Sequence, residues 1–212
     1  MNTSTLVHIP ADTVTVEGML EIPERASGLV LFAHGSGSSR HSPRNNYVAG
    51  VLRQAGIGTL LMDLLTPEED LDYAQRFDIG LLTQRLLAAA NWVGVQESTR
   101  ALPLGFFGAS TGAAAALEAA ALLGQDAKAV VSRGGRPDLA SRQALMSVTA
   151  PTLLLVGGED GIVIDLNQQA YDQLRCEKKL LIIPGATHLF EEAGTLEHVA
   201  SLAADWFRNQ LR

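Results

Sequence analysis

A serine in a glycine-rich pattern is the residue of this 212-residue chain most suited to covalent chemistry. Ser110 lies in Gly108-Ala-Ser-Thr-Gly112, which directly follows the apolar run 104–107 and opens an Ala-rich segment. The G-x-S-x-G pattern between a strand and a helix forces the serine into a sharp turn, where its hydroxyl stands exposed at the helix N-terminus. The alternative is a glycine-rich turn whose serine only caps the helix. We predict that Ser110 is a nucleophile.

A serine hydroxyl reacts only when a neighbouring base removes its proton, and histidine is the usual base. The chain has five histidines. His188 follows the last apolar run and precedes the final helical segment, whereas His198 falls within that segment. His8 belongs to the N-terminal strand pattern and His41 to a polar loop. Because function in open sheets lies at the carboxyl ends of strands, His188 is the predicted base.

The imidazole of such a base needs an acid that holds its tautomer. Asp160, in Gly157-Gly-Glu-Asp-Gly161, follows the penultimate apolar run. Glu159 is the nearest rival, and Asp160 itself could instead form a turn or cap a helix. We predict the order Ser110, Asp160, His188, which is the order of nucleophile, acid and base in α/β-hydrolases.

A glycine-rich turn provides the other half of the predicted machinery. His34-Gly35-Ser36-Gly37 follows the apolar run 29–33 and can point backbone N–H groups at a carbonyl oxygen. We expect the oxyanion hole to consist of the backbone amides of Ser36 and of Thr111, the residue after the nucleophile. The side chain of His34 is expected to brace this turn by hydrogen bonding.

Arginines cluster around the predicted site, namely Arg40, Arg44, Arg133 and Arg136. A guanidinium in a concave site can bind a substrate carboxylate or phosphate in a bidentate manner. Arg40, Arg44 and Arg133 are therefore candidate substrate-binding residues for an anionic ester or lactone. Ion pairs with acids such as Asp63 or Asp138 are the alternative for each arginine.

Two kinds of apolar period alternate along the chain. Runs bounded by turn residues are typical of strands buried on both faces of a parallel sheet, and they occupy residues 29–33, 59–62, 104–107, 129–131, 152–156 and 180–183. Residues 13–22 alternate with a period near two and, with residues 6–9, predict an antiparallel hairpin. Helical spacing covers residues 46–54, 81–93, 111–123, 164–174 and 196–207. This order predicts a single α/β domain over residues 1–212, with helices on both faces of the sheet.

The charge balance and composition exclude several classes of protein. Sixteen basic residues against 23 acidic ones leave a net charge of −7, which disfavours binding to a nucleic acid backbone. The single cysteine permits neither an internal disulfide nor a C-x-x-C zinc site, so we expect no metal and no cofactor. No leader or membrane span is evident, and we expect a cytoplasmic protein, monomeric or homodimeric, acting on a small molecule.

These motifs together resemble the α/β-hydrolase superfamily, and within it the dienelactone hydrolase-like group. The resemblance runs from residues 29–35 through the serine and acid motifs to Ala186-Thr-His188. It implies an eight-stranded, mostly parallel sheet with strand 2 antiparallel, and cleavage of an ester or lactone through an acyl-enzyme. Dienelactone hydrolases proper use a cysteine where this chain has Ser110, which argues against dienelactone itself as the substrate. Residues 132–151 leave no room for the lid domain of many members, so we expect an open site.

Two other classes of function compete with this hypothesis. Gly35-Ser-Gly-Ser-Ser-Arg40 begins like a dinucleotide-binding fingerprint, but Arg40 replaces its third glycine. The acidic Asp63 also lies farther along the chain than the fingerprint requires. A hydrolase fold kept only for binding is the second alternative, because a fold does not dictate a function.

Overall fold

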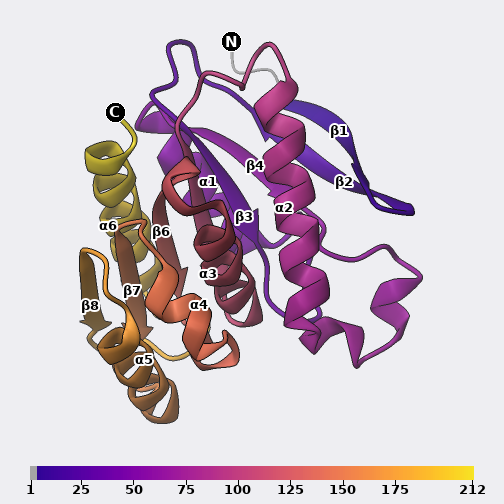
Figure 1. Cartoon of the computed structure of the whole chain (residues 1–212). Helices are drawn as coiled ribbons and strands as arrows, with labels where there is room; N and C mark the ends of the chain where they lie inside the picture. Colours follow the sequence, from indigo (N-terminus) through magenta and orange to yellow (C-terminus); the bar gives the residue numbers. More distant parts are fainter. Residues whose placement is uncertain (1–3) are drawn as a thin grey trace.

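The computed structural model describes residues 4–212, and an eight-stranded sheet forms the centre of the fold (Figure 1). The strands are β1 (Ser4–Ala11), β2 (Val14–Glu21), β3 (Leu29–Ala33), β4 (Gly58–Met62), β5 (Leu104–Ala109), β6 (Ala127–Arg133), β7 (Thr152–Gly157) and β8 (Lys178–Ile183). They lie side by side in the order β1-β2-β4-β3-β5-β6-β7-β8. Strand β2 is antiparallel to both of its neighbours, and the remaining pairs are parallel. The predicted fold class is therefore confirmed.

The burial of each strand follows its hydrophobic pattern. Every residue of β3, β4 and β7 is buried, as expected for continuous apolar runs covered on both faces. The outer strand β1 alternates between exposed and buried residues along its second half, which matches a strand with one face in solvent.

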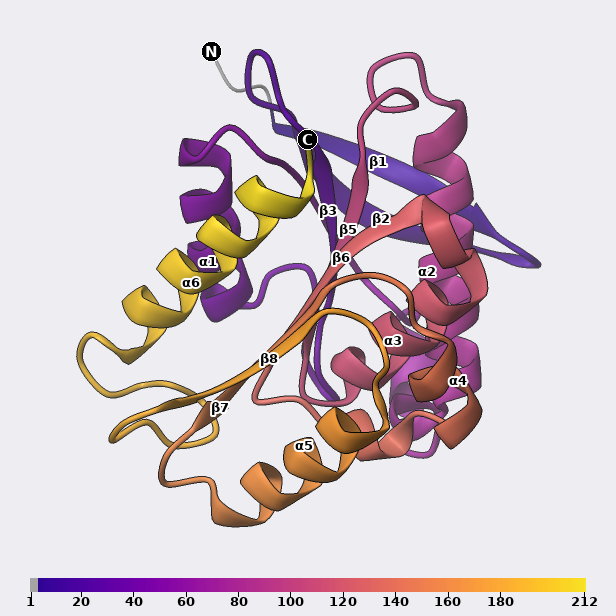
Figure 2. The same ribbon diagram turned by 60° about the vertical axis from the view of Figure 1, so that its left-hand side comes forward.

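Six α-helices surround the sheet: α1 (Pro43–Gln54), α2 (Ile79–Val95), α3 (Thr111–Leu123), α4 (Arg142–Ser147), α5 (Gly161–Gln173) and α6 (Thr195–Gln210), within residues 4–212. Figure 2 shows α1 and α6 on one face and α2, α3, α4 and α5 on the other. Each face has its own hydrophobic core: Phe107 and Phe207 belong to the α1/α6 side, and Phe106 and Leu117 to the α2/α3 side. The five longer helices correspond to predicted segments. Helix α4 was not predicted, because its six residues are too few to show a helical period.

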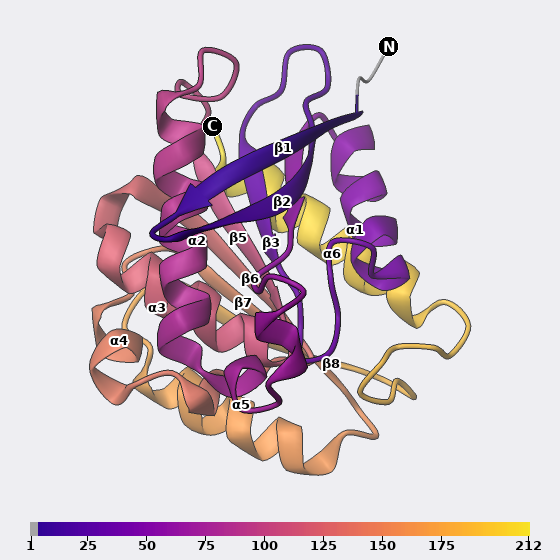
Figure 3. The same cartoon turned by 90° about the vertical axis from the view of Figure 1, so that its right-hand side faces the viewer.

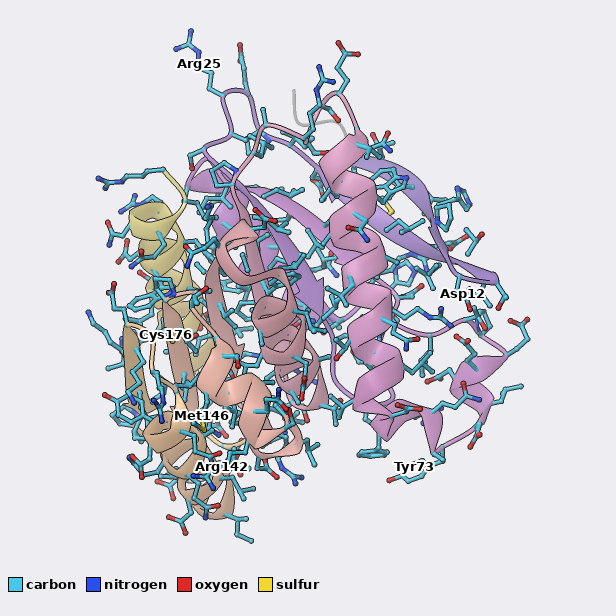
Figure 4. All side chains as sticks on the ribbon, viewed as in Figure 1. Asp12, Arg25, Tyr73, Arg142, Met146 and Cys176 are labelled. Carbon is cyan, nitrogen blue, oxygen red and sulfur yellow. The ribbon has the colours of Figure 1, made fainter. Side chains whose placement is uncertain are left out.

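Residues 66–78, between β4 and α2, form an irregular segment that the apolar pattern did not predict (Figure 3). It contains two short 3-10 turns, η1 (Glu69–Leu71) and η2 (Gln75–Phe77). Tyr73 lies between these two turns and is exposed (Figure 4). The segment is nevertheless anchored, because the Arg85 guanidinium of α2 lies 2.6 Å from Glu69 Oε1.

The parallel strands all end at one edge of the sheet, which is the lower edge in Figure 1. His34, Ser110 and Gly134 come directly after β3, β5 and β6, and the loops that follow β7 and β8 carry Asp160 and His188. The predicted site residues therefore gather at this edge. In the described part of the chain, no helix is both long and apolar enough to cross a membrane.

Candidate active site

Ser110 occupies a strained turn between β5 and α3. Its backbone angles are φ 50° and ψ −123°, a region that residues other than glycine rarely adopt. Although Ser110 is the N-cap residue of α3, its side chain makes no capping hydrogen bond. The hydroxyl is thus left available, which goes against the alternative that this serine only caps the helix.

The turn also needs a glycine at its far end, because the helix passes very close to β3. A Cβ atom at Gly112 would lie 2.3 Å from the Ala33 carbonyl oxygen and 2.5 Å from that of His34. Such contacts cannot be relieved, since both involve backbone atoms. The last glycine of G-x-S-x-G therefore brings the loop after β3 against the turn that carries Ser110.

An imidazole and a carboxylate meet between the loops that follow β7 and β8. His188 Nδ1 lies 2.6 Å from Asp160 Oδ2. Asp160 is the N-cap residue of α5, yet its side chain makes no capping hydrogen bond. The Glu159 side chain is exposed, and only its backbone N–H contacts the histidine loop, through the Ala186 carbonyl. Of the two acids considered from the sequence, Asp160 is the one that contacts His188.

Two contacts hold the loop that carries His188, one at Gly157 and one at Glu192. A Cβ atom at Gly157 would lie 2.4 Å from the Ala186 carbonyl oxygen, so only glycine lets this loop approach the end of β7. Farther along, the Thr187 hydroxyl and N–H both donate to the Glu192 carboxylate. These hydrogen bonds lower the pKa of Glu192 below its ordinary value. No motif in the sequence marks Glu192 as part of the site.

A cavity of about 230 Å³ joins Ser110 to His188 at the carboxyl edge of the sheet. We call it the polar chamber, and its lining consists of Gly35, Ser36, Ser38, Ser42, Arg44, Asn45, Ala109, Ser110, Arg133, Gly134, His188 and Leu189. Within residues 4–212 no direct hydrogen bond joins the Ser110 hydroxyl to His188, and such bonds commonly tighten only when substrate binds.

The predicted oxyanion turn lies directly against the serine turn. A Cβ atom at Gly35 would lie 3.0 Å from Ser110 Cβ and 3.7 Å from Ser110 Oγ. Thr111 is the first residue of α3, so its N–H has no acceptor within the helix. In the described part of the chain, neither this N–H nor that of Ser36 donates to a loop carbonyl. Both amides are thus available beside the Ser110 hydroxyl.

His34 ties the oxyanion turn to the loop after β4. Its Nε2 accepts a hydrogen bond from the Leu64 N–H at 3.0 Å, so Nδ1 carries the proton and donates to the Gly35 carbonyl at 2.9 Å. Burial of the ring lowers the pKa of His34, and the bond to Gly35 partly opposes that effect. The neutral imidazole braces the turn, in agreement with the role expected from the sequence.

Arg133, the last residue of β6, is a buried cation without a carboxylate partner among the described residues. Only its Nη2 has an acceptor, Asn45 Oδ1 at 3.4 Å, while Nε and Nη1 have none there. Burial lowers the pKa of Arg133 to about 10, and the charge of Arg44 adds to that shift. The chamber wall therefore holds a positive charge that the protein itself leaves unneutralised.

The other arginines differ in their surroundings. Arg44 lines the chamber and lies 3.0 Å from the exposed carboxylate of Glu191. Arg40 is absent from the chamber wall and pairs with Asp63 and Glu17. Arg136 makes a two-pronged ion pair with Asp138. The structure therefore shows ion pairs for Arg40, Arg44 and Arg136, and of these three only Arg44 also lines the chamber.

Asn45 and Ser42 were not predicted as site residues, although a sequence signal for them exists. Ser42 followed by Pro43 is typical of a helix start, and the Ser42 hydroxyl does accept from the Asn45 N–H at 3.3 Å. This start places the first turn of α1 in the chamber wall. Within the described residues, no group of three or more potential metal ligands comes together.

Known structures share this architecture over the whole chain. A dienelactone hydrolase from Anabaena variabilis superimposes with a TM-score of 0.97 at 55% identity, covering 100% of this chain and 99% of that one. Est1E from Butyrivibrio proteoclasticus gives 0.83 at 17% identity over 97% and 98% of the two chains. A lidless α/β serine hydrolase from Xanthomonas campestris gives 0.79 at 22% identity over 97% and 94%. No protein-family model matches the chain.

Curated relatives come from two strains of Mycobacterium tuberculosis and are provisionally named phosphoribosyl transferases. Each is 58% identical over 205 residues, which cover 97% of this chain but 46% of the relative. The chain thus spans about half the length of the curated relatives it matches.

The strand order and the strained serine turn are those of a hydrolase with the α/β-hydrolase fold. The 55% identity over essentially the full length of both chains then places the protein more narrowly. The chain belongs to the dienelactone hydrolase-like group of α/β-hydrolases.

Proposed function

We propose that the protein is a serine hydrolase that cleaves a small ester or lactone through an acyl-enzyme. Ser110 is the nucleophile, His188 the base and Asp160 the acid that orients His188. The contact of 2.6 Å between His188 Nδ1 and Asp160 Oδ2 carries this proposal, because it leaves His188 Nε2 free beside the chamber that Ser110 lines. The group to which the chain belongs supports the reaction class.

The reaction begins when Ser110 Oγ attacks the substrate carbonyl carbon and its proton passes to His188 Nε2. The Ser36 and Thr111 amides stabilise the negative oxygen of the tetrahedral intermediate. The intermediate then expels the alcohol, which takes the proton from His188, and the acyl group stays on Ser110. Water next gives a proton to His188 and attacks the acyl carbon, and the acid leaves as Ser110 regains its proton.

The proposed substrate carries a negative charge. A buried guanidinium without a carboxylate partner is costly, and a bound carboxylate or phosphate would offset that cost. Arg133 lines the chamber, two of its buried nitrogens have no partner among the described residues, and Arg44 lines the same chamber. Arg40 is not part of this proposal, because Asp63 and Glu17 already neutralise it.

Labelling with a fluorophosphonate tests the nucleophile without knowledge of the substrate. We expect one adduct, located on the Ser110 peptide by mass spectrometry, and none in Ser110→Ala. That variant should also lose about 10⁴- to 10⁶-fold in kcat on any ester that the wild type cleaves. Ser201→Ala, at an exposed position of α6, is the control and should label like the wild type. An unlabelled wild-type protein would favour a hydrolase fold kept for binding.

The names of the mycobacterial relatives suggest a second activity. We infer that any phosphoribosyl transfer belongs to the part of those relatives that this chain does not span. Arg40 stands where a dinucleotide fingerprint needs glycine. Its side chain is held at that position by ion pairs with Asp63 and Glu17. This chain should therefore show neither phosphoribosyl transfer nor saturable binding of NAD(P), and either result would revive a nucleotide function.

A further inference from the structure

One peptide group in the loop after β6, between Gly135 and Arg136, is held on both of its sides. Its N–H donates to the Ser110 carbonyl oxygen at 3.0 Å. Its carbonyl oxygen accepts from the side-chain amide of Asn167, in α5, at 2.9 Å. Because a trans peptide group is planar and its N–H and C=O point in opposite directions, fixing one side also fixes the other. The Asn167 side chain therefore orients the donor that binds the backbone of Ser110.

The Ser110 backbone depends on such contacts because its conformation is strained. A non-glycine residue at φ 50° and ψ −123° persists only where its surroundings enforce it. The Ser110 carbonyl accepts from two N–H groups, that of Ala113 within α3 at 3.1 Å and that of Arg136. The Ser110 N–H donates to the Arg133 carbonyl at 3.4 Å, which is long for a hydrogen bond. The bond from Arg136 is thus the shorter of the two that join Ser110 to β6 and its loop.

Gly135 makes this peptide group both tightly packed and easy to rotate. A Cβ atom at Gly135 would lie 2.0 Å from Ser132 Oγ and 2.6 Å from Ala113 Cβ, so no side chain fits there. Glycine also has the widest backbone freedom, so the peptide group after it turns readily when its hydrogen bonds are lost. In the described part of the chain, Asn167 is the only donor to the buried Gly135 carbonyl. Without that donor the carbonyl would be buried and unpaired, and relief by rotation would turn the N–H away from the serine turn.

The Asn167 amide has one fixed orientation. The residue is fully buried, and its Nδ2 also donates to the Val163 carbonyl, one turn earlier in α5, at 2.8 Å. Both neighbours are acceptors, so the nitrogen of the amide faces them. Its Oδ1 atom has no hydrogen-bond partner within residues 4–212. An unpaired buried oxygen lowers stability, so stability alone does not account for an asparagine at this position.

Helix α5 connects this contact to the other half of the proposed catalytic machinery. Asp160 is the N-cap residue of α5, and its carbonyl accepts from the Ile164 N–H at 2.9 Å. Its carboxylate lies 2.6 Å from His188 Nδ1. Asn167 lies about two turns farther along the same helix. One helix therefore contacts the imidazole through its first residue and the serine turn through its middle, and it sets the separation of the two.

We propose that Asn167 is a positioning residue of the hydrolase. Through the Gly135–Arg136 peptide group it holds the strained backbone of Ser110. Through α5 it keeps the serine turn at a fixed distance from Asp160. This inference rests on the proposed function and adds to it a residue that is absent from the wall of the polar chamber.

Two substitutions separate the hydrogen bonds of Asn167. Asn167→Ala removes both. Asn167→Thr has nearly the same volume, and its hydroxyl can donate to the Val163 carbonyl, as threonines in helices often do. Because a hydroxyl has one proton to donate, the Gly135 carbonyl is then left without a donor. Asn167→Thr therefore tests the contact with the loop after β6 while the helix keeps its own hydrogen bond.

Turnover of p-nitrophenyl acetate measures the effect on the reaction. We expect kcat to fall by about 10- to 100-fold in both variants, because displacing a reacting group by about 1 Å costs up to about 10²-fold. KM should change by less than about twofold, since Asn167 does not line the chamber, so kcat and kcat/KM fall together. The rate of labelling by the fluorophosphonate should fall by a similar factor.

Hydrogen exchange reports directly on the peptide group. The Arg136 amide hydrogen, followed by NMR, should exchange at least about tenfold faster in both Asn167 variants than in the wild type. The amide of Val131, within β6, should keep its wild-type rate because the strand itself is not altered. A general loss of stability would instead accelerate both amides.

Two control variants separate positioning from stability. Thr99 is buried at the opposite edge of the sheet, and its hydroxyl donates to the Val93 carbonyl at 2.6 Å. Thr99→Val therefore also removes a buried bond from a side chain to a backbone carbonyl, and it should keep wild-type kcat. Gln168→Ala removes an exposed amide beside Asn167 on α5 and should also keep wild-type kcat.

The role of Asn167 and the proposed function fail in different ways. If the fluorophosphonate does not label wild-type Ser110, the hydrolase function itself fails. If the wild type is labelled but Asn167→Thr keeps wild-type kcat, the inference about Asn167 is overturned. An equal loss of kcat in Thr99→Val also overturns it. Asn167→Thr decides the matter if Asn167→Ala does not fold, because it preserves the volume and the bond within the helix.

Discussion

The Asp160 carboxylate and the His188 imidazole lie 2.6 Å apart, although 28 residues separate them in the chain. The bond joins the loop after β7 to the loop after β8, which are neighbouring strands. Asp160 starts α5 but makes no side-chain capping bond, so its carboxylate is committed to the imidazole. A carboxylate at Nδ1 holds the proton there and leaves Nε2 as an acceptor.

Replacing Asp160 by asparagine should therefore reduce turnover while preserving the fold. The amide can hold the imidazole in the wrong tautomer and cannot stabilise its charged form, so we expect kcat to fall by about 10⁴-fold. Ester hydrolysis under saturating substrate measures the effect. Glu159→Gln, at the adjacent exposed position, is the matched control and should keep wild-type turnover. If Glu159→Gln is the more damaging substitution, the acid has been misassigned.

His34 should make the stability of the protein depend on pH. Burial lowers the pKa of His34 in the folded chain below the ordinary value of 6.5. At a pH below 6.5, the unfolded chain therefore binds a proton at this residue more readily than the folded chain does. The free energy of unfolding should thus decrease as the pH falls below about 6.5, by at most about 1.4 kcal/mol per pH unit from this group. Above that value His34 contributes no pH dependence.

Urea unfolding of His34→Gln at several pH values measures this contribution. The variant should lose part of the acid sensitivity that the wild type shows. His198→Gln changes an exposed histidine of α6 and should follow the wild-type curve. Identical acid sensitivity in wild type and His34→Gln would contradict the role of the buried neutral ring.

The sequence predicted which of the candidate residues lie where the strands end. Ser110, Asp160 and His188 each follow a continuous apolar run, and the parallel order of the runs brings their ends to one edge. The G-x-S-x-G pattern also predicted the strained turn. Sequence patterns were sufficient here because each motif is local and its position in the sheet follows from hydrophobic period alone.

Contacts between distant segments were not predictable in the same way. Asn45 meets Arg133 across 88 residues, and nothing in either neighbourhood marks the pair. Residues 66–78 have no regular apolar period, so their two 3-10 turns could not be predicted from the sequence. The sequence also could not predict which acid pairs with which arginine, since Asp63 and Asp138 were possible partners for each of them.

Arg133 should favour binding at the expense of stability. Its buried guanidinium has no carboxylate partner among residues 4–212, and replacing an uncompensated charge by an apolar side chain of similar size removes a desolvation cost. We expect Arg133→Met to raise the free energy of unfolding by about 1 kcal/mol or more, which is about 2–4 °C in Tm for a chain of this size. The gain should shrink above a pH of about 10, because the pKa of Arg133 near that value lets the folded wild type lose the charge.

Thermal unfolding near neutral pH measures the gain in stability. The same measurement with an anionic ester present measures the loss of anion binding. Arg133→Lys is the comparison variant, since it retains a positive charge but loses the planar donor fork, and it should gain less stability than Arg133→Met. The preference for the anionic ester should fall in both variants. A less stable Arg133→Met would mean that the guanidinium contributes more through Asn45 and the ring of Phe190, 6.0 Å away, than its burial costs.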